Sequence, residues 1–305
     1  MTSSPPKRLV YLGTPQAAVA PLRALVAAEF DVALVVSQPD RRRGRGGALV
    51  PSPVKAAAAE LGLAVSDQVG DVIGVGADLG VVVAFGRLIG SDVLEAVPMV
   101  NLHFSLLPRW RGAAPVERAL LAGDAETGVC LMALEAGLDT GPVHECVSTP
   151  IDDEETADEL RARLVELGTE MLVRNLVEGL GTARPQEGQS TYAAKIDPRE
   201  LEIDWRRPAS EVHRLVRLGA AWTTFRGRRL KVRRATGTGS AMVADVELTP
   251  GAVLTTSAGV LVGTGSGPLE LVEVQPEGKP AQRARDWANG ARPGPAEHFG
   301  GSGPT

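Results

Sequence analysis

A segment near the middle of the chain carries an amide and an imidazole two residues apart. Asn101 and His103 follow the apolar residues Met99 and Val100, at the expected end of a strand. On an extended backbone, side chains two residues apart point to the same face. The amide can donate or accept a hydrogen bond, and the imidazole can do either near neutral pH. This pair can act on a polar group of a substrate, or it can be a hydrogen-bonded pair at a strand end.

The residues that follow predict a shaped loop and then a helix. Pro108 interrupts regular structure and Gly112 marks a turn. Pro115 suits the first turn of a helix that continues through residues 116–121. A strand end, a loop and a helix start are where α/β proteins place their chemistry.

A second segment, residues 137–141, presents one carboxylate on a tight loop. Gly137 and Gly141 supply backbone freedom on either side of Asp139, so the loop displays the aspartate instead of burying it. A lone aspartate between glycines is usually structural. Together with Asn101 and His103, however, it makes a possible acid–base group with an orienting partner.

The elements that must position these residues are predicted to form an α/β fold. Apolar runs at 8–13, 32–37, 79–84 and 99–103 predict buried parallel strands, and residues 16–27 and 54–61 predict helices between them. Further strands are expected at 127–133 and 143–148, and a long helix at 153–178. This order indicates a Rossmann-like domain. Gly13 is not followed by the dinucleotide fingerprint, which argues against an NAD site.

The C-terminal third has a different pattern. A helix is expected at 208–218, and short strands at 229–234, 251–256, 259–264 and 269–274 are separated by Gly and Pro. This pattern predicts a small open β-barrel of the OB type. We therefore divide the chain into a catalytic domain (1–187), a linker (188–204), an OB-like domain (205–291) and a disordered tail (292–305).

Composition bounds the class of protein. The 305 residues are 44% hydrophobic and 23% charged, as in ordinary globular proteins, and only 4% are aromatic, so a mostly aliphatic core is expected. Cys130 and Cys146 lie in apolar runs without metal-ligand spacing, which predicts buried, reduced thiols. No apolar run approaches the roughly 20 residues that span a bilayer. Residues 2–6 do not resemble a signal peptide, and a cytoplasmic location is expected.

The charge is divided unevenly along the chain. Residues 1–204 carry 18 Lys and Arg against 29 Asp and Glu, a net of −11, whereas residues 205–305 carry 14 against 8, a net of +6. Ten basic residues and one acidic residue lie between Arg206 and Arg234. The asymmetry indicates a polyanionic partner for the C-terminal part, the alternative being a solvated basic face.

Three motifs together resemble a known family. Asn-x-His-x-Ser-Leu-Leu-Pro at 101–108, Arg-Gly-Ala-Ala-Pro at 111–115 and Gly-Leu-Asp-Thr-Gly at 137–141 are similar to the folate-dependent formyltransferases. The Arg-Gly-Ala-Ala-Pro form resembles the branch of that family that acts on methionyl-tRNA. The resemblance extends from about Lys7 to Asp286.

The resemblance implies a reaction and its residues. A formyl group would pass from 10-formyltetrahydrofolate to the α-amino group of initiator methionyl-tRNA, without a metal. Asn101 and His103 would donate to the oxyanion, while Asp139 would orient His103 and accept the proton of the amine. The folate-binding segment would be Ser105, Leu106, Leu107 and Pro108.

The family also implies where RNA binds. Its loop beside the active site, which engages the acceptor end of the tRNA, corresponds to residues 38–55, and four arginines there are candidate contacts: Arg41, Arg42, Arg43 and Arg45. Further candidates are the basic residues of the C-terminal domain, Arg226, Arg228, Arg229 and Lys231. Three positions depart from the family pattern: Gln16, Phe85 and Ala221.

Other functions stay open at this point. Glycinamide ribonucleotide formyltransferases share the Asn, His and Asp but normally stop after one domain, and sugar-nucleotide formyltransferases have no need for such a basic second domain. A formyltetrahydrofolate hydrolase would use water as acceptor. An RNA-binding protein with an inactive Rossmann-like domain is the alternative outside enzymes. A monomer is expected for this chain.

Overall fold

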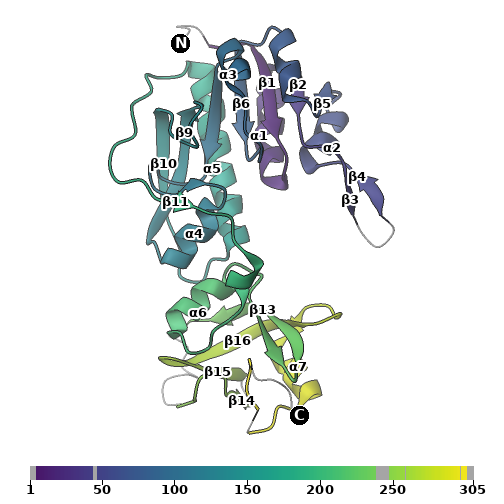
Figure 1. Cartoon of the computed structure of the whole chain (residues 1–305), viewed down its shortest axis with the longest axis vertical. Helices are drawn as coiled ribbons and strands as arrows, with labels where there is room; N and C mark the ends of the chain where they lie inside the picture. The colour runs from purple at the N-terminus through teal and green to yellow at the C-terminus, as the bar shows by residue number, and fades with distance from the viewer. Residues whose placement is uncertain (1–4, 44–46, 238–246, 258, 296, 301–305) are drawn as a thin grey trace. The chain divides into compact units, whose positions relative to one another are not determined.

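The computed structural model describes residues 5–43, 47–237, 247–257, 259–295 and 297–300 (Figure 1). Contacts within the chain divide it into two compact units. The first unit consists of residues 1–116, 126–150 and 161–194, and the second of residues 117–125, 151–160 and 195–305.

The first unit is built on a sheet of seven strands in the order β10-β9-β7-β6-β1-β2-β5. Five strands are parallel, and β9 and β10 run antiparallel at one edge. The strands are β1 (Arg8–Gly13), β2 (Asp31–Val36), β5 (Val65–Ser66), β6 (Leu79–Val83), β7 (Met99–His103), β9 (Glu126–Ala133) and β10 (Val143–Pro150). The predicted Rossmann-like α/β fold is confirmed. Strands β6 and β7 are buried at every residue, as expected for parallel strands that are covered on both faces of the sheet.

Helices and short elements complete this part of the chain. The helices are α1 (Val19–Ala27), α2 (Pro53–Glu60), α3 (Ser91–Ala96), α4 (Pro115–Ala122) and α5 (Ala157–Glu178), with 3-10 turns η1 (Gln16–Ala18), η2 (Val69–Gly74) and η3 (Pro198–Leu201). Most of α4, the first turn of α5 and all of η3 belong to the second unit. Two short ladders pair β3 (Arg41–Arg43) with β4 (Ala48–Val50) and β8 (Arg111–Gly112) with β11 (Tyr192–Ala193). An apolar cluster that includes Leu12, Val36, Val82 and Met99 lies among these elements.

The long helix α5 begins later than the sequence predicts. The acidic residues at 153–155 precede the helix, and Thr156 and Glu159 close its first turn. The amide of Glu159 donates to the Thr156 hydroxyl at 3.3 Å, and the amide of Thr156 donates to the Glu159 carboxylate at 2.8 Å. This reciprocal capping satisfies two otherwise unpaired amides, so it determines where the helix starts.

The second unit contains an antiparallel sheet that curls into a half-barrel, as the OB-type prediction requires. Its strand order is β12-β13-β16-β15-β14, with β17 paired to β16. The elements are α6 (Ala209–Val216), β12 (Trp222–Phe225), β13 (Arg228–Thr236), β14 (Val253–Thr255), β15 (Val260–Thr264), β16 (Gly267–Pro276), β17 (Gln282–Arg283) and α7 (Ala284–Ala291). The sequence reading missed the helix α7.

Aromatic rings form the centre of the second unit's core. Trp205, Phe225, Trp287 and Phe299 contact one another, with ring centroids 5.1–5.8 Å apart. The expectation of a mostly aliphatic core is confirmed for the described residues of this unit, because the four aromatic residues are surrounded by sixteen buried Ala, Val, Leu and Ile residues. The expected disordered tail differs from the structure, since Phe299 is only 4% exposed. Residues 301–305 lie outside the described part of the chain.

The two cysteines are joined, contrary to the prediction of reduced thiols. Cys146 on β10 lies directly opposite Cys130 on β9, and the two form a disulfide. Directly opposed positions on antiparallel strands bring Cβ atoms within reach of a sulfur–sulfur bond. Cys130 is fully buried and Cys146 is exposed. Spacing in the sequence gives no register between the strands, so it could not reveal this pairing.

Among the described residues, no helix combines the length and the apolar character that crossing a bilayer would require.

The aromatic core yields a stability prediction. Phe299→Ala removes a buried ring that contacts Trp205, Phe225 and Trp287, and should lower the free energy of unfolding by about 3–5 kcal/mol. Urea unfolding followed by tryptophan fluorescence measures the change, because three of the four tryptophans belong to this unit. Leu88→Ala is the control, since Leu88 is 84% exposed and its loss should cost less than about 0.5 kcal/mol. Equal midpoints for the two variants would contradict this account of the core.

Candidate active site

The end of strand β7 brings Asn101 and His103 to one face of the first sheet. Both are buried, at 8% and 5% exposure. In the ladder with β9, Asn101 lies opposite Met132 and His103 lies opposite Cys130. A strand that is paired on both sides cannot shift its register without exposing its apolar residues, so the two side chains keep their common face.

The loop after β7 folds back over the imidazole. Trp110 has a positive φ of 60°, and its carbonyl oxygen lies 2.8 Å from Nε2 of His103. A carbonyl oxygen only accepts hydrogen bonds, so Nε2 carries the hydrogen of this pair. The Ser105 hydroxyl donates to the carbonyl of Arg109 at 2.6 Å and stabilises the same loop. The loop thereby sets both the tautomer and the orientation of the ring.

The other nitrogen of the imidazole faces the carboxylate of Asp139. Nδ1 of His103 lies 3.6 Å from Oδ2 of Asp139, and the two side chains are 6% and 11% exposed. The same oxygen accepts a hydrogen bond from the amide of Gly112 at 2.8 Å. At 3.6 Å the contact between His103 and Asp139 is too long for a hydrogen bond and is electrostatic. The carbonyl of Trp110, which is hydrogen-bonded to the same ring, therefore shares the orienting role that was expected of Asp139. A proton on Nδ1 would make the contact an ion pair.

The conformation of the loop around Asp139 explains its glycines. Asp139 has a φ of 51°, in the left-handed region that aspartate tolerates better than most residues. A Cβ atom on Gly141 would lie 1.9 Å from the carbonyl oxygen of Ala133 on β9. Only glycine fits there, because the clash is with backbone. The loop is therefore pressed against the end of β9, beside the residues of β7.

The expected folate segment is an ordered part of the same loop. Ser105 is fully buried and its hydroxyl is engaged within the loop, while Leu106, Leu107 and Pro108 are half-buried. Leu106 lies against Gly128 of β9, where an added Cβ would be 2.5 Å from its Cδ2. The segment offers backbone polar groups and partly exposed leucines to a ligand, and the Ser105 side chain serves the loop itself.

The arginine-rich segment forms a hairpin. Arg41, Arg42 and Arg43 make up β3, which pairs with β4. Arg41 donates to Gln38 at 2.5 Å, and Arg42 donates to the carbonyl of Gly47 at 3.2 Å. The predicted contact Arg45 lies outside the described residues.

Within the second unit, the predicted RNA contacts do not share one face. Arg229 lies 3.9 Å from the ring centroid of Trp222, and Lys231 is the register partner of that tryptophan, so these cations alternate with the buried core residues of β13. Arg228 is exposed at the start of the strand. Arg226 instead pairs with Glu297 at 2.5 Å. Its guanidinium lowers the pKa of Glu297 to about 2, so the pair stays ionised and compensated at neutral pH.

The structure gives the burial of the three residues that depart from the family pattern. Gln16 is exposed in η1, and Ala221 is fully buried before β12. The ring of Phe85 is buried, and its carbonyl accepts hydrogen bonds from Thr14 at 3.0 Å and from Gln38 at 3.1 Å.

One residue of the site escaped the sequence reading. Gln186 lies in the polar segment before the expected linker, yet its amide donates to the carbonyls of Asp139 and Gly141, both at 2.8 Å. Its carbonyl accepts from Arg111 at 3.0 and 2.7 Å. A glutamine among prolines and glycines carries no spacing signal, so only the folded chain reveals this contact.

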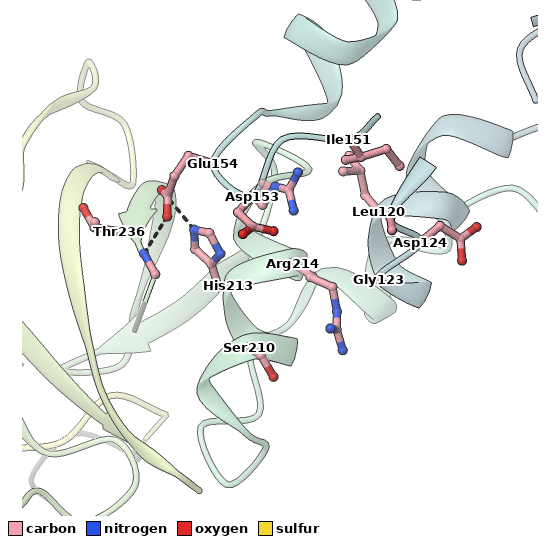
Figure 2. Close-up of a pocket in the computed structure, with 13 residues that line it drawn as sticks. Leu120, Gly123, Asp124, Ile151, Asp153, Glu154, Ser210, His213, Arg214 and Thr236 are labelled. Atoms are coloured by element: carbon pink, nitrogen blue, oxygen red, sulfur yellow. Dashed lines mark hydrogen bonds and ion pairs between the residues drawn. The ribbon is translucent and has the colours of Figure 1, made fainter. Parts of the chain in front are cut away.

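A cavity of about 690 Å³ lies elsewhere, in the second unit (Figure 2). Figure 2 shows His213 and Glu154 pointing toward each other, with Nε2 and Oε2 3.4 Å apart, and Glu154 also bonded to the backbone of Gly237. Burial lowers the pKa of the Arg217 guanidinium, which donates to the carbonyl of Glu155 at 2.7 Å. Glu154 and Arg217 of this cavity are thus engaged by His213 and by backbone groups. None of the three candidate catalytic residues lines the cavity.

The described residues contain no group of three or more His, Cys, Asp and Glu side chains that could hold a metal ion.

Comparisons with known proteins show which family the chain belongs to. The sequence profile of the formyl transferase family matches residues 7–176, and the profile of the formyl transferase C-terminal domain matches residues 195–292. A methionyl-tRNA formyltransferase from Thermobifida fusca is 43% identical over 96% of this chain and 99% of its own length. One from Roseobacter denitrificans is 43% identical over 93% and 96%.

Solved structures share the fold at low identity. An N-formyltransferase from Helicobacter canadensis, in complex with folinic acid and dTDP-3-aminofucose, has a TM-score of 0.65 at 17% identity, covering 87% of this chain and 98% of its own. A methionyl-tRNA formyltransferase from Clostridium thermocellum has a TM-score of 0.59 at 15% identity, covering 76% and 95%. With both domain profiles matched and relatives above 40% identity along nearly the whole chain, this protein belongs to the formyl transferase family, among the methionyl-tRNA formyltransferases.

Proposed function

We propose that the chain transfers a formyl group from 10-formyltetrahydrofolate to the α-amino group of initiator methionyl-tRNA. One observation carries the proposal. The end of β7 and the loop at 137–141 put an imidazole nitrogen 3.6 Å from a carboxylate, beside the amide side chain of Asn101 on the same strand face. The names of the relatives supply the substrate class.

The reaction needs a base, an oxyanion partner and a proton for the leaving group. The amine nitrogen forms a bond to the formyl carbon, and the bond from that carbon to N10 of the folate breaks. The amine loses a proton and N10 gains one, so the products are an N-formyl group and tetrahydrofolate. The intermediate between them is tetrahedral and carries negative charge on oxygen, which fixed hydrogen-bond donors stabilise.

The residues at the site divide these tasks. Asn101 donates its amide hydrogen to the developing oxyanion. Asp139 accepts the proton of the attacking amine, and Nδ1 of His103, next to that carboxylate, takes part in passing a proton to the leaving nitrogen. Nε2 stays on the carbonyl of Trp110, which keeps the ring in place during the transfer.

The formyl donor needs an apolar wall and backbone partners. The half-buried side chains of Leu106 and Leu107 supply the wall for the pterin ring, and backbone groups of residues 105–108 can bond its polar edge. Ser105 contributes through its backbone, because its hydroxyl is already engaged with Arg109.

The acceptor RNA would be held by cations of both units. The hairpin of β3 and β4, with Arg41, Arg42 and Arg43, meets the acceptor end, and Arg45 is a further candidate from the sequence. Arg229 and Lys231 on β13, next to the ring of Trp222, suit a phosphate backbone and an unstacked base. Arg228, exposed at the start of the same strand, is a further candidate, whereas Arg226 is the weakest of the four because Glu297 compensates its charge.

The proposal includes a monomer acting in the cytoplasm. The disulfide between Cys130 and Cys146 is unusual for that compartment.

A formylation assay tests the reaction directly. The purified protein is mixed with 10-formyltetrahydrofolate and methionyl initiator tRNA, and formyl-methionine is measured after hydrolysis of the product. Activity that disappears in His103→Ala supports both the reaction and the site. Release of tetrahydrofolate with an amino sugar or with water, but not with the tRNA, would replace the acceptor. Binding of tRNA without any turnover would favour an RNA-binding protein.

Asp139→Asn should lower kcat by about 10²–10⁴-fold, because the amide keeps the shape of the carboxylate but cannot accept the proton. The dissociation constant of the folate should change little. Steady-state kinetics and equilibrium folate binding measure the two effects. Glu135→Gln, an exposed carboxylate four residues earlier, is the matched control and should keep full activity. Near-normal turnover of Asp139→Asn would remove Asp139 from the mechanism.

The double variant Arg229→Ala/Lys231→Ala should weaken tRNA binding and reduce the slope of log Kd against log salt by about 1–2, one unit for each lost phosphate contact. Arg226→Ala should change Kd by less than about twofold, because its charge is already paired with Glu297. Filter binding at several salt concentrations gives both quantities. An unchanged slope in the double variant, or a larger effect in Arg226→Ala, would locate the RNA surface elsewhere on the unit.

A further inference from the structure

Residues 184–193, which we call the strap, run across both loops of the candidate active site. At one end, Arg184 and Val143 exchange backbone hydrogen bonds of 2.8 Å. At the other end, β11 pairs with β8, and the carbonyls of Thr191 and Ala193 accept from the loop that follows β7. The sequence reading divided the strap between the catalytic domain and a linker that begins at residue 188. Its contacts instead hold the two loops that carry the chemistry.

Gln186 is the side chain through which the strap holds the Asp139 loop. Its Nε2 donates to two carbonyls of that loop, those of Asp139 and Gly141, each at 2.8 Å. Its Oε1 accepts two hydrogen bonds from Arg111. All the polar capacity of one amide is thus spent between the two loops.

The chemistry of the neighbours determines how the amide is turned. A flipped amide would place its oxygen against two carbonyl oxygens and its NH₂ against a guanidinium that can only donate. Both contacts would be repulsive. Gln186 therefore presents its NH₂ to the Asp139 loop and its oxygen to Arg111, and no other common side chain of this length offers both groups.

A second contact of the strap is with the backbone of Trp110, the residue that holds the imidazole of His103. The hydroxyl of Thr191 accepts the amide hydrogen of Trp110 at 2.8 Å, and the carbonyl of the same tryptophan accepts from Nε2 of His103. Through Gln186 and Thr191, one short segment touches the immediate supports of both His103 and Asp139.

The Asp139 loop needs such a support. Asp139 is in the left-handed region with a φ of 51°, a conformation that persists only where the surroundings determine it. Its carbonyl points to Gln186 while its carboxylate accepts from Gly112 and faces His103. Without the bond to Gln186, the peptide after Asp139 could rotate and carry the carboxylate away from the imidazole.

We propose that Gln186 is a positioning residue for formyl transfer, which holds the Asp139 carboxylate at its working distance from His103. This inference rests on the proposed function. Displacement of a reacting group by about 1 Å can cost about 10²-fold in rate. The role is confined to geometry, because Gln186 donates to backbone carbonyls and not to a reacting atom.

Gln186→Glu separates the two halves of the bridge. The carboxylate still accepts from Arg111, so the support of that arginine is retained, but it cannot donate to the carbonyls of Asp139 and Gly141. We expect kcat to fall about 10–100-fold. The KM for 10-formyltetrahydrofolate, the Kd for tRNA and Tm should stay close to those of the unchanged protein. Gln186→Met, which loses both halves, should show a similar fall in kcat and a lower Tm.

Gln68→Glu is the matched control. Gln68 is an exposed glutamine of the same unit whose side-chain amide donates to the neighbouring Asp67. The control adds the same charge without touching the site, and it should keep the activity of the unchanged protein. An equal loss in Gln68→Glu would assign the effect to charge and overturn the positioning role.

A double-mutant cycle with Asp139→Asn provides the decisive measurement. If Gln186 acts through Asp139, Gln186→Glu should cause little further loss of kcat in the Asp139→Asn background, measured in single turnovers with excess enzyme. Multiplicative losses would overturn the proposal, as would full activity of Gln186→Glu alone. Full activity of Asp139→Asn would instead remove the catalytic assignment itself, so the two failures are distinguishable.

Discussion

The contact between the imidazole of His103 and the carboxylate of Asp139 depends on two loops that are far apart in sequence. Neither side chain is held by the other alone, since 3.6 Å is too long for a hydrogen bond. The ring is held by the carbonyl of Trp110, and the carboxylate by the amide of Gly112. Both partners belong to the loop after β7. The loop after β7 thus contacts both groups directly, Gln186 holds the loop that carries the carboxylate, and the sheet sets the position of the loop after β7.

The sheet can do so because its central strands are buried and paired on both sides. β7 lies between β6 and β9, so its last residues cannot slide. The carboxyl end of a parallel strand is also where loops are free to differ from protein to protein. Glycines at 112 and 141 allow the loops to approach backbone closely, where any side chain would collide. The site therefore combines a rigid strand end with loops that only these residues can form.

The ion pairs of the folded chain change the picture that a count of basic and acidic residues gives. The basic C-terminal part contains cations that are already compensated, such as Arg226 with Glu297 and Arg207 with Glu211. Arg217 is buried against backbone carbonyls and supports the fold. We propose the solvent face of β13, where Arg229 stacks on the ring of Trp222, as the surface for an anionic partner. The net charge of +6 belongs to residues 205–305 alone, and it does not show which of these cations are already paired.

Local sequence determined the longer strands of the two large sheets, most of the helices and the three residues of the candidate catalytic group. These follow from patterns that are complete within a few residues: a buried apolar run, a polar pair at its end, and an aspartate between glycines. Tertiary structure alone decided the disulfide between Cys130 and Cys146, the burial of Phe299, the pairing of Arg226 and the bridge of Gln186. Each of these joins segments that come together only after the chain has folded. Their partners depend on the register between strands and on the path of loops, and a side chain gives no local sign of either.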